Sequence, residues 1–252
     1  MSAPAGRLAG RVAVVTGASR GIGRAVALRF AAEGAQVVAL ARSVGGLEEL
    51  DDEMRRAGGL PALLVPIDLA ELDRIDPLGP QLYQRFGKVD ILVANAALLG
   101  TLGPIGHHDP KLWDEVFRVN VHANWRLIRT LDPLLRRAGK GRAIFVTSGA
   151  SSKANAYWSA YCASKAALDQ MVRVWALELA STDVRANLLS PGATRTTMRA
   201  NAFPGEDPMT LKPPEALCDL FVELALGECE RNGETIVAPP LTAQRGGAAC
   251  RR

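Results

Sequence analysis

Thr16-Gly17-Ala18-Ser19-Arg20-Gly21-Ile22-Gly23 follows directly on a short apolar run, residues 12–16, and leads into a helical pattern near 22–33. Glycines at such a junction permit a tight turn, close approach of the backbone to a phosphate, and close packing of helix on strand. The free N–H groups at the helix N-terminus then attract a pyrophosphate. Placed between a buried strand and a helix, this stretch predicts a dinucleotide-binding loop rather than an ordinary turn.

Six further apolar runs follow along the chain. Most of them are nearly continuous in Val, Ile, Leu and Ala, which is typical of strands buried on both faces of a parallel sheet. They lie at residues 36–41, 62–67, 89–94, 143–147, 185–189 and 234–238, with helical patterns near 22–33, 46–57, 70–86, 110–137, 156–180 and 214–227. This alternation predicts an α/β, doubly wound (Rossmann-like) fold, a three-layer sandwich around a seven-stranded parallel sheet.

The chain contains no internal repeat and no linker composition that would divide it, so residues 1–252 are predicted to form a single domain. The longest irregular stretch, 203–214, comes after the sixth predicted strand and is rich in Pro and Gly. Such a position favours a lid over a site, near 196–214, rather than a domain boundary. Residues 239–252 are expected to form a loose C-terminal tail.

Composition excludes several classes of protein. Hydrophobic residues make up 48% and charged residues 22%, and the net charge of +4 comes without a basic stripe, so we expect no nucleic-acid partner. No apolar stretch is long enough for a membrane helix and the N-terminus lacks a signal sequence, so we expect no membrane partner. The four scattered cysteines indicate a cytoplasmic protein without a metal site: Cys162, Cys218, Cys229 and Cys250.

Three side chains suggest acid–base chemistry. Tyr161 and Lys165 are four residues apart in a helical pattern, so they share a helix face. A neighbouring ammonium should lower the pKa of the phenol, which would let Tyr161 exchange a proton with a carbonyl or an alcohol. Ser148 follows the fifth predicted strand, at the edge where ligands of doubly wound folds bind, and can orient the substrate oxygen.

The end of the second predicted strand bears on the choice of cofactor. An NAD site normally has an acidic residue there, which binds the ribose hydroxyl. This chain has Ala41 followed by Arg42, and a second arginine, Arg20, lies in the glycine loop. Two guanidiniums suit a 2′-phosphate, so NADP(H) is predicted in preference to NAD(H).

The glycine spacing TGxxxGxG and four later motifs together resemble the short-chain dehydrogenase/reductase family over nearly the whole chain. The later motifs are Asn95-Ala96-Ala97, Asn120, Ser148 with Tyr161-Cys162-Ala163-Ser164-Lys165, and Pro191-Gly192 with Thr196. The resemblance implies the catalytic residues Asn120, Ser148, Tyr161 and Lys165, with Asn120 holding a water that links the lysine to solvent. It implies a cofactor site made of Gly17, Ser19, Arg20, Gly21, Ile22, Gly23, Arg42, Ser43, Asp68, Leu69, Asn95, Tyr161, Lys165, Pro191, Gly192, Thr194 and Thr196.

Two alternatives stay open within this set, and the chain departs from the family at several positions. Asp68 can lie beside the adenine or serve as a helix N-cap. Ala94 and Ala97 replace an Asn and a Gly of the family motif, and the usual Asp-Gly-Gly after the last strand is absent, so a homodimer is as compatible with the sequence as a homotetramer. Residues 194–204 resemble a bacterial subgroup of the family that has no settled substrate.

The function expected from these residues is an NADP(H)-dependent oxidoreductase. It would transfer hydride between the nicotinamide and a carbonyl or secondary alcohol of a small substrate, with Tyr161 as the general acid or base. A catalytically silent NADP(H)-binding protein, acting as a redox sensor or scaffold, is the alternative. Trp125, Trp158 and Trp175 are expected to belong to the core or to an interface rather than to a ligand site.

Overall fold

The computed structural model describes residues 6–241, and its centre is one sheet of seven parallel strands. The strands are β1 (Val12–Thr16), β2 (Gln36–Ala41), β3 (Leu63–Pro66), β4 (Ile91–Ala94), β5 (Arg142–Val146), β6 (Arg185–Ser190) and β7 (Thr235–Val237). Their order is β3-β2-β1-β4-β5-β6-β7, and every neighbouring pair is parallel. The predicted doubly wound fold is confirmed.

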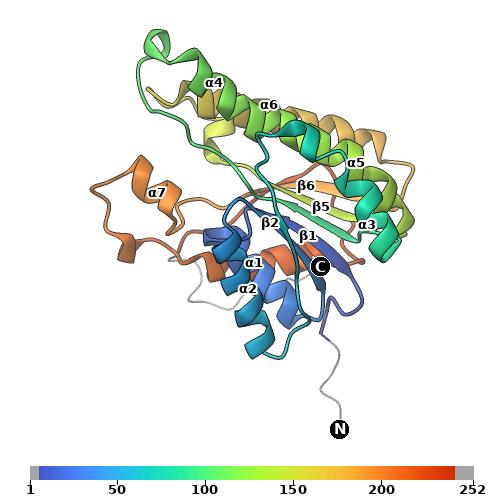
Figure 1. The fold of residues 1–252 in the computed structure, drawn as a ribbon. Coiled ribbons are helices and arrows are strands. Elements are labelled where there is room, and N and C mark those ends of the chain that lie inside the picture. The colour runs from blue at the N-terminus through green and yellow to red at the C-terminus, as the bar shows by residue number, and fades with distance from the viewer. Residues whose placement is uncertain (1–5, 242–252) are drawn as a thin grey trace.

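Helices cover both faces of the sheet and make three layers (Figure 1). One face carries α1 (Gly21–Ala32), α2 (Val44–Arg56) and α8 (Cys218–Ala225). The other carries α3 (Leu78–Phe86), α5 (Ala123–Arg137) and α6 (Ser159–Glu178), with α4 (Pro110–Phe117) beside α6. The short helix α7 (Thr197–Ala202) belongs to neither layer and stands out from the body of the molecule.

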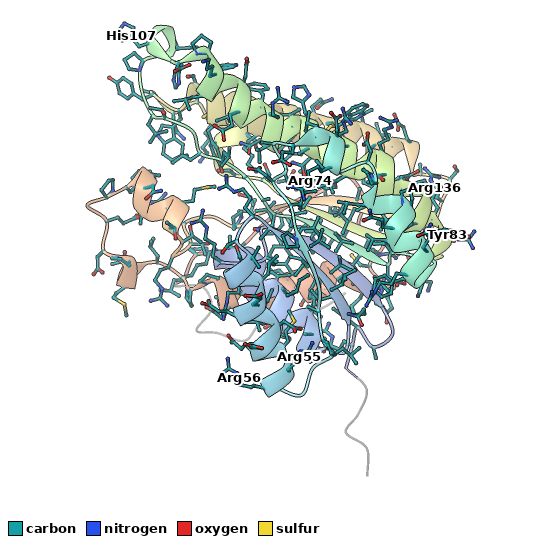
Figure 2. All side chains as sticks on the ribbon, viewed as in Figure 1. Arg55, Arg56, Arg74, Tyr83, His107 and Arg136 are labelled. Atoms are coloured by element: carbon teal, nitrogen blue, oxygen red, sulfur yellow. The ribbon has the colours of Figure 1, made fainter. Side chains whose placement is uncertain are left out.

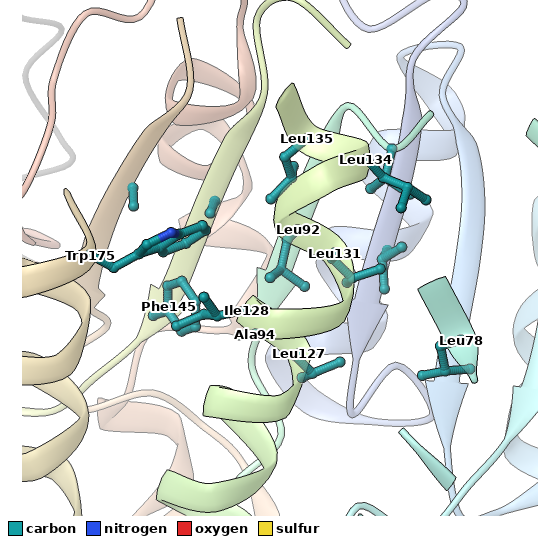
Figure 3. Close-up of a cluster of buried hydrophobic side chains, with 14 of the residues drawn as sticks. Leu78, Leu92, Ala94, Leu127, Ile128, Leu131, Leu134, Leu135, Phe145 and Trp175 are labelled. Atoms are coloured by element: carbon teal, nitrogen blue, oxygen red, sulfur yellow. The ribbon is translucent and has the colours of Figure 1, made fainter. Parts of the chain in front are cut away.

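Each face of the sheet has its own apolar core. On the α5 side, Leu127 and Leu131 point from the helix toward Leu92 and Phe145 of the strands, with Trp175 of α6 beside them (Figure 3). Burial on both faces explains why the strand sequences are continuously apolar. Charged side chains such as Arg56 lie on the outside (Figure 2), and no helix within residues 6–241 is long and apolar enough to cross a membrane.

The strand order places the functional edge of the sheet. The chain runs outward through β1, β2 and β3, and then returns to add β4 on the other side of β1. The carboxyl ends of β1 and β4 therefore diverge into a crevice, where doubly wound proteins bind ligands. The loops that begin at Thr16 and at Ala94 both open into this crevice.

Three predicted elements differ in detail from the structure. The helix expected at 70–86 is a 3₁₀ turn, Leu72–Arg74, followed by α3, because Pro77 interrupts the pattern. The helix expected at 110–137 contains a π-helical turn, Arg118–His122, between α4 and α5. The stretch 203–214, expected to be irregular, contains the 3₁₀ turn Pro208–Thr210 and is preceded by α7, and most of the tail predicted at 239–252, residues 242–252, lies outside the described residues.

The contact between α1 and the glycine loop depends on Gly23. A Cβ atom on Gly23 would lie 2.3 Å from the carbonyl oxygen of Gly17 and 2.5 Å from Nδ2 of Asn95. No side chain is compatible with these distances, so the helix can approach the loop this closely only with glycine at this position.

We expect Gly23→Ala to destabilise the protein by about 1–3 kcal/mol, because the new methyl group must push α1 away from the loop. Intrinsic helix propensity alone would favour alanine by about 1 kcal/mol, so the two effects have opposite signs. Urea denaturation measures the difference. Gly45→Ala, in α2 with no heavy atom within 4 Å of the added Cβ, is the matched control and should be neutral or stabilising; equal effects at both positions would contradict the packing argument.

Candidate active site

The glycine loop is fixed by hydrogen bonds to the loop after β4. Thr16 Oγ1 accepts hydrogen bonds from the backbone N–H groups of Asn95 (2.9 Å) and Ala96 (3.0 Å). Asn95 Nδ2 in turn donates to the carbonyl oxygen of Thr16 at 2.9 Å. Gly17 and Gly21 adopt positive φ values of 65° and 56°, which glycine tolerates without strain. The loop is therefore held open above the N-terminus of α1.

A single large cleft of about 1210 Å³ runs from this loop to Tyr161. It collects almost every residue predicted for the site. The two predicted residues that do not line it are Gly23, which packs α1 against the loop, and Asn120. Both lie behind the cleft wall, so the sequence pattern did not separate lining residues from supporting ones, and the roles of the lining residues stay predictions.

Ser148 and Tyr161 meet at the floor of the cleft. Ser148 follows β5, and its Oγ accepts a hydrogen bond from Ala150 N at 3.2 Å. Burial raises the pKa of Tyr161 to about 12, and a hydrogen bond with Ser148 only partly offsets this effect. The expectation that Lys165 lowers the pKa of this phenol is wrong for the structure as it stands, because desolvation of the phenolate dominates.

Lys165 lies one turn after Tyr161 on α6 and is only 2% exposed. Its Nζ donates a hydrogen bond to the carbonyl oxygen of Val146 at 2.8 Å and lies 5.9 Å from the centre of the Tyr161 ring. Burial lowers the pKa of Lys165 to about 8, and the carboxylate of Asp169 acts in the opposite direction. A buried ammonium near its titration point can change charge in the neutral range.

Asp169 is a site residue that the sequence analysis missed. It is 3% exposed, accepts a short hydrogen bond from the hydroxyl of Thr147, and lies 3.8 Å from Arg173. Its position four residues after Lys165 was the available signal, since such residues are neighbours on a helix. Asp169 is the acidic group that supports the charge on Lys165 from the side away from the cleft.

Asn120 lies in the π-helical turn and is completely buried. Its Oδ1 accepts from Leu98 N at 2.8 Å, and its Nδ2 donates to Leu98 O at 2.8 Å and to Ser164 Oγ at 3.0 Å. These bonds join the loop after β4 to the helix that carries Tyr161 and Lys165. The side chain therefore positions two walls of the cleft, and its predicted link to a water stays a prediction.

The cofactor end of the cleft is basic, with one acidic exception. Arg20 and Arg42 are exposed there, and Arg42 Nη1 lies 3.8 Å from Asp68 Oδ2. Asp68 also accepts a hydrogen bond from Ala70 N at 2.9 Å, so it caps a turn rather than a helix, while still lining the cleft. Ser43 accepts from Gly46 N at 3.1 Å and is the N-cap of α2.

The segment around α7 is anchored at both ends. Residues Thr194 and Lys212 pair as a short parallel bridge, with Arg195 N donating to Lys212 O at 2.9 Å. Lys212 is 2% exposed, and its Nζ donates to Pro239 O at 2.8 Å, just beyond β7. Trp158 lines the cleft beside Phe203 of this segment and is therefore not a core residue, whereas Trp175 is in the core.

The cleft offers no metal site, since no cluster of three or more His, Cys, Asp or Glu suited to a metal ion occurs among the described residues. The fold and these side chains define a nucleotide-binding crevice joined to a buried tyrosine and lysine. Residues 11–207 match the short chain dehydrogenase family. The chain belongs to that family and is an oxidoreductase of the kind that uses a nicotinamide cofactor.

Individual relatives cover nearly the full chain. The uncharacterized oxidoreductase YciK of Escherichia coli K12 is 35% identical over 233 residues, 91% of this chain and 92% of the relative. An uncharacterized NAD-dependent oxidoreductase of Mycobacterium tuberculosis is 35% identical over 261 residues, covering 89% of this chain and 92% of that protein. The crystal structure of a short chain dehydrogenase from E. coli CFT073, complexed with NADPH, superposes with a TM-score of 0.89 at 35% identity, over 94% of this chain and all of that one.

Lys165→Met should raise the free energy of unfolding by about 1–3 kcal/mol at pH 7, because it removes a buried charge whose pKa is lowered from 10.5 to about 8. The unfolded state binds the proton more tightly than the folded state. The stability of the wild type therefore rises with pH between about 8 and 10.5, and its deficit relative to the variant should shrink there.

Urea denaturation of both proteins at pH 7 and at pH 10 measures this difference. The exposed Lys153→Met is the matched control and should show no pH-dependent difference from the wild type. A Lys165→Met variant that is less stable than the wild type at pH 7, or a gain in stability that does not change with pH, would show that burial of the ammonium carries no such cost.

Proposed function

We propose that the protein is an NADP(H)-dependent oxidoreductase that interconverts a carbonyl and a secondary alcohol on a small substrate, with Tyr161 as the general acid or base. The observation that carries this proposal is the meeting of Ser148, Tyr161 and Lys165 in the same cleft as the glycine loop. A binding protein would need the loop alone. Burying the Tyr161 phenol and the Lys165 ammonium costs free energy, and a role in proton transfer would explain why both are buried in the cleft.

The residues present fit a dinucleotide. Gly17 and Gly21 leave the loop without side chains where the pyrophosphate would lie, above the N-terminus of α1. Pro191, Gly192, Thr194 and Thr196 line the opposite wall and would hold the nicotinamide half. When bound, a reduced nicotinamide supplies hydride to the carbonyl carbon.

Preference for NADP(H) rests on Arg20 in the glycine loop and on Arg42 after β2, where Ala41 leaves no acid to repel a 2′-phosphate. Asp68 acts against this preference, because its carboxylate lies 3.8 Å from the Arg42 guanidinium and competes with a phosphate for it. A phosphate offers Arg42 a stronger partner than one carboxylate at that distance, so we infer that Arg42 turns to the 2′-phosphate.

The protein's own residues handle the proton. A phenol whose pKa is about 12 is protonated at neutral pH, so Tyr161 is ready to donate to a carbonyl oxygen. The Ser148 hydroxyl can hold that oxygen by a hydrogen bond, and the Lys165 ammonium stabilises the negative charge left on the Tyr161 oxygen. This state of the site favours reduction over oxidation.

A catalytically silent NADP(H)-binding sensor or scaffold is the second candidate, and complete retention of the catalytic side chains argues against it. A cytoplasmic location, a homodimeric or homotetrameric state, a single domain over 1–252 and a lid at 196–214 belong to the same proposal. The anchored ends of the lid segment, at Thr194 and Lys212, support the last of these.

Tyr161→Phe should lower kcat by about 100-fold or more, because the ring still packs but has no proton to give. NADPH affinity, measured by fluorescence titration, should stay within about twofold of the wild type. Tyr157→Phe is the matched control, since Tyr157 is exposed and lies outside the cleft. Retention of more than a tenth of the wild-type kcat by Tyr161→Phe would rule out this role.

Arg42→Ala should weaken NADPH binding by about 10- to 100-fold and NADH binding little, because a charge-assisted hydrogen bond contributes about 1.5–3 kcal/mol. Adding Ala41→Asp should invert the preference, since the new carboxylate repels phosphate and accepts from a ribose hydroxyl. Calorimetric titration of both cofactors decides, with exposed Arg56→Ala as the control. Equal losses for both cofactors would refute the assignment, as would a wild-type preference for NADH.

A further inference from the structure

The half of the cleft beyond Tyr161 has a wall that the proposed chemistry does not use. Trp158 is the N-cap residue of α6 and lines the cleft, and its indole meets the Tyr161 ring edge-on, with ring centres 6.0 Å apart. A carbonyl held at the Tyr161 hydroxyl therefore has the body of its molecule beside this indole.

The backbone before Trp158 is held in a strained conformation. Tyr157 has a φ of 72°, and it is the one non-glycine residue with positive φ among residues 6–241. Such a conformation costs about 1–3 kcal/mol and persists where surrounding contacts impose it. Here Gly103 N donates to Tyr157 O at 2.9 Å and Trp158 N donates to Asn155 O at 3.2 Å. These bonds fix the direction in which the indole enters the cleft.

The lid segment supplies a second ring to the same wall. Phe203, at the end of α7, lies 5.5 Å from Trp158 between ring centres. The guanidinium of Arg199 stacks 3.7 Å above the Phe203 ring and is held by both carboxylate oxygens of Glu206, at 2.6 and 2.7 Å. Phe203 thus contacts both a fixed cation and Trp158 and extends the aromatic wall, and Arg199 itself also lines the cleft.

The remaining surroundings point to the same kind of ligand. Leu98, Leu99 and Leu102 line this half from the loop after β4. Asp68 is the one acidic residue among the described residues that line the cleft, and it lies at the cofactor end. Lys153, Asn155 and Asn201 also line the cleft, whereas Trp158, Phe203 and the three leucines offer a flat ring dispersion and aromatic contacts.

We propose that the substrate is a carbonyl compound bearing a flat, apolar ring next to the carbonyl carbon, and that Trp158 selects for this ring. The inference rests on the proposed function, in which the carbonyl carbon gains hydride from NADPH, its oxygen gains the Tyr161 proton, and the products are an alcohol and NADP⁺. Trp158 and Phe203, whose rings touch, together form the surface against which the ring packs.

The test measures kcat/KM of the full chain with NADPH for three carbonyl classes: an aryl methyl ketone, a linear 3-oxoacyl thioester and a polyhydroxy ketone. The wild type should prefer the aryl ketone. Trp158→Leu should lower kcat/KM for it by about 3- to 10-fold, as expected for loss of an aromatic contact, with little effect on the linear substrate. Trp158→Phe should retain most of the selectivity.

Two controls keep the result interpretable. Trp125→Leu removes an exposed indole on α5 outside the cleft and should change nothing. Phe203→Leu tests the same wall from the lid and should lower aryl-ketone selectivity even if Trp158→Leu folds poorly. Preference of the wild type for the linear or polyhydroxy substrate overturns the inference, as does an equal loss for all classes in Trp158→Leu. NADPH binding without turnover of any carbonyl would instead refute the proposed function.

Discussion

The hydroxyl of Thr16 is the point on which the site depends. β1 and β4 are neighbours in space but are separated in sequence by two other strands, and their loops diverge at the crevice. Two backbone N–H groups from the loop after β4 donate to Thr16 Oγ1, and the Asn95 side-chain amide donates to the carbonyl oxygen of Thr16. This tie fixes the nucleotide loop relative to the loop that approaches the substrate. Asn120 extends the connection from Leu98 to α6.

A second constraint concerns charge. The buried face of α6 carries one ammonium, on Lys165, and one carboxylate, on Asp169. Among the described residues, no salt bridge joins these two side chains. Lys165 donates its hydrogen bond to the carbonyl oxygen of Val146, the last residue of β5. Asp169 accepts a hydrogen bond from the hydroxyl of the next residue, Thr147. The end of the strand therefore separates the two charges. The ammonium keeps a free side toward the cleft, which a contact ion pair would remove.

Sequence patterns predicted the sheet and most of the cleft, because continuous apolar runs and glycine spacings reflect local requirements. Gly17 and Tyr161 are examples: one needs a positive φ, and the other stands one helical turn from a lysine. The properties that the sequence misjudged arise from burial and from contacts between distant segments. The high pKa of Tyr161 follows from desolvation, and the contact of Trp158 with Phe203 joins two segments that lie far apart in the sequence.

Lys212 connects the chain that follows β7 with the segment around α7. Its buried ammonium is bonded to Pro239 O, immediately after the last strand, while its backbone closes the base of the segment that carries Phe203. The position of that segment is therefore set partly by the path of the chain leaving β7. A substitution that moves the Pro239 carbonyl would therefore also move the segment that carries Phe203. The described residues after β7 do not line the cleft, yet through Lys212 they help to set its mouth.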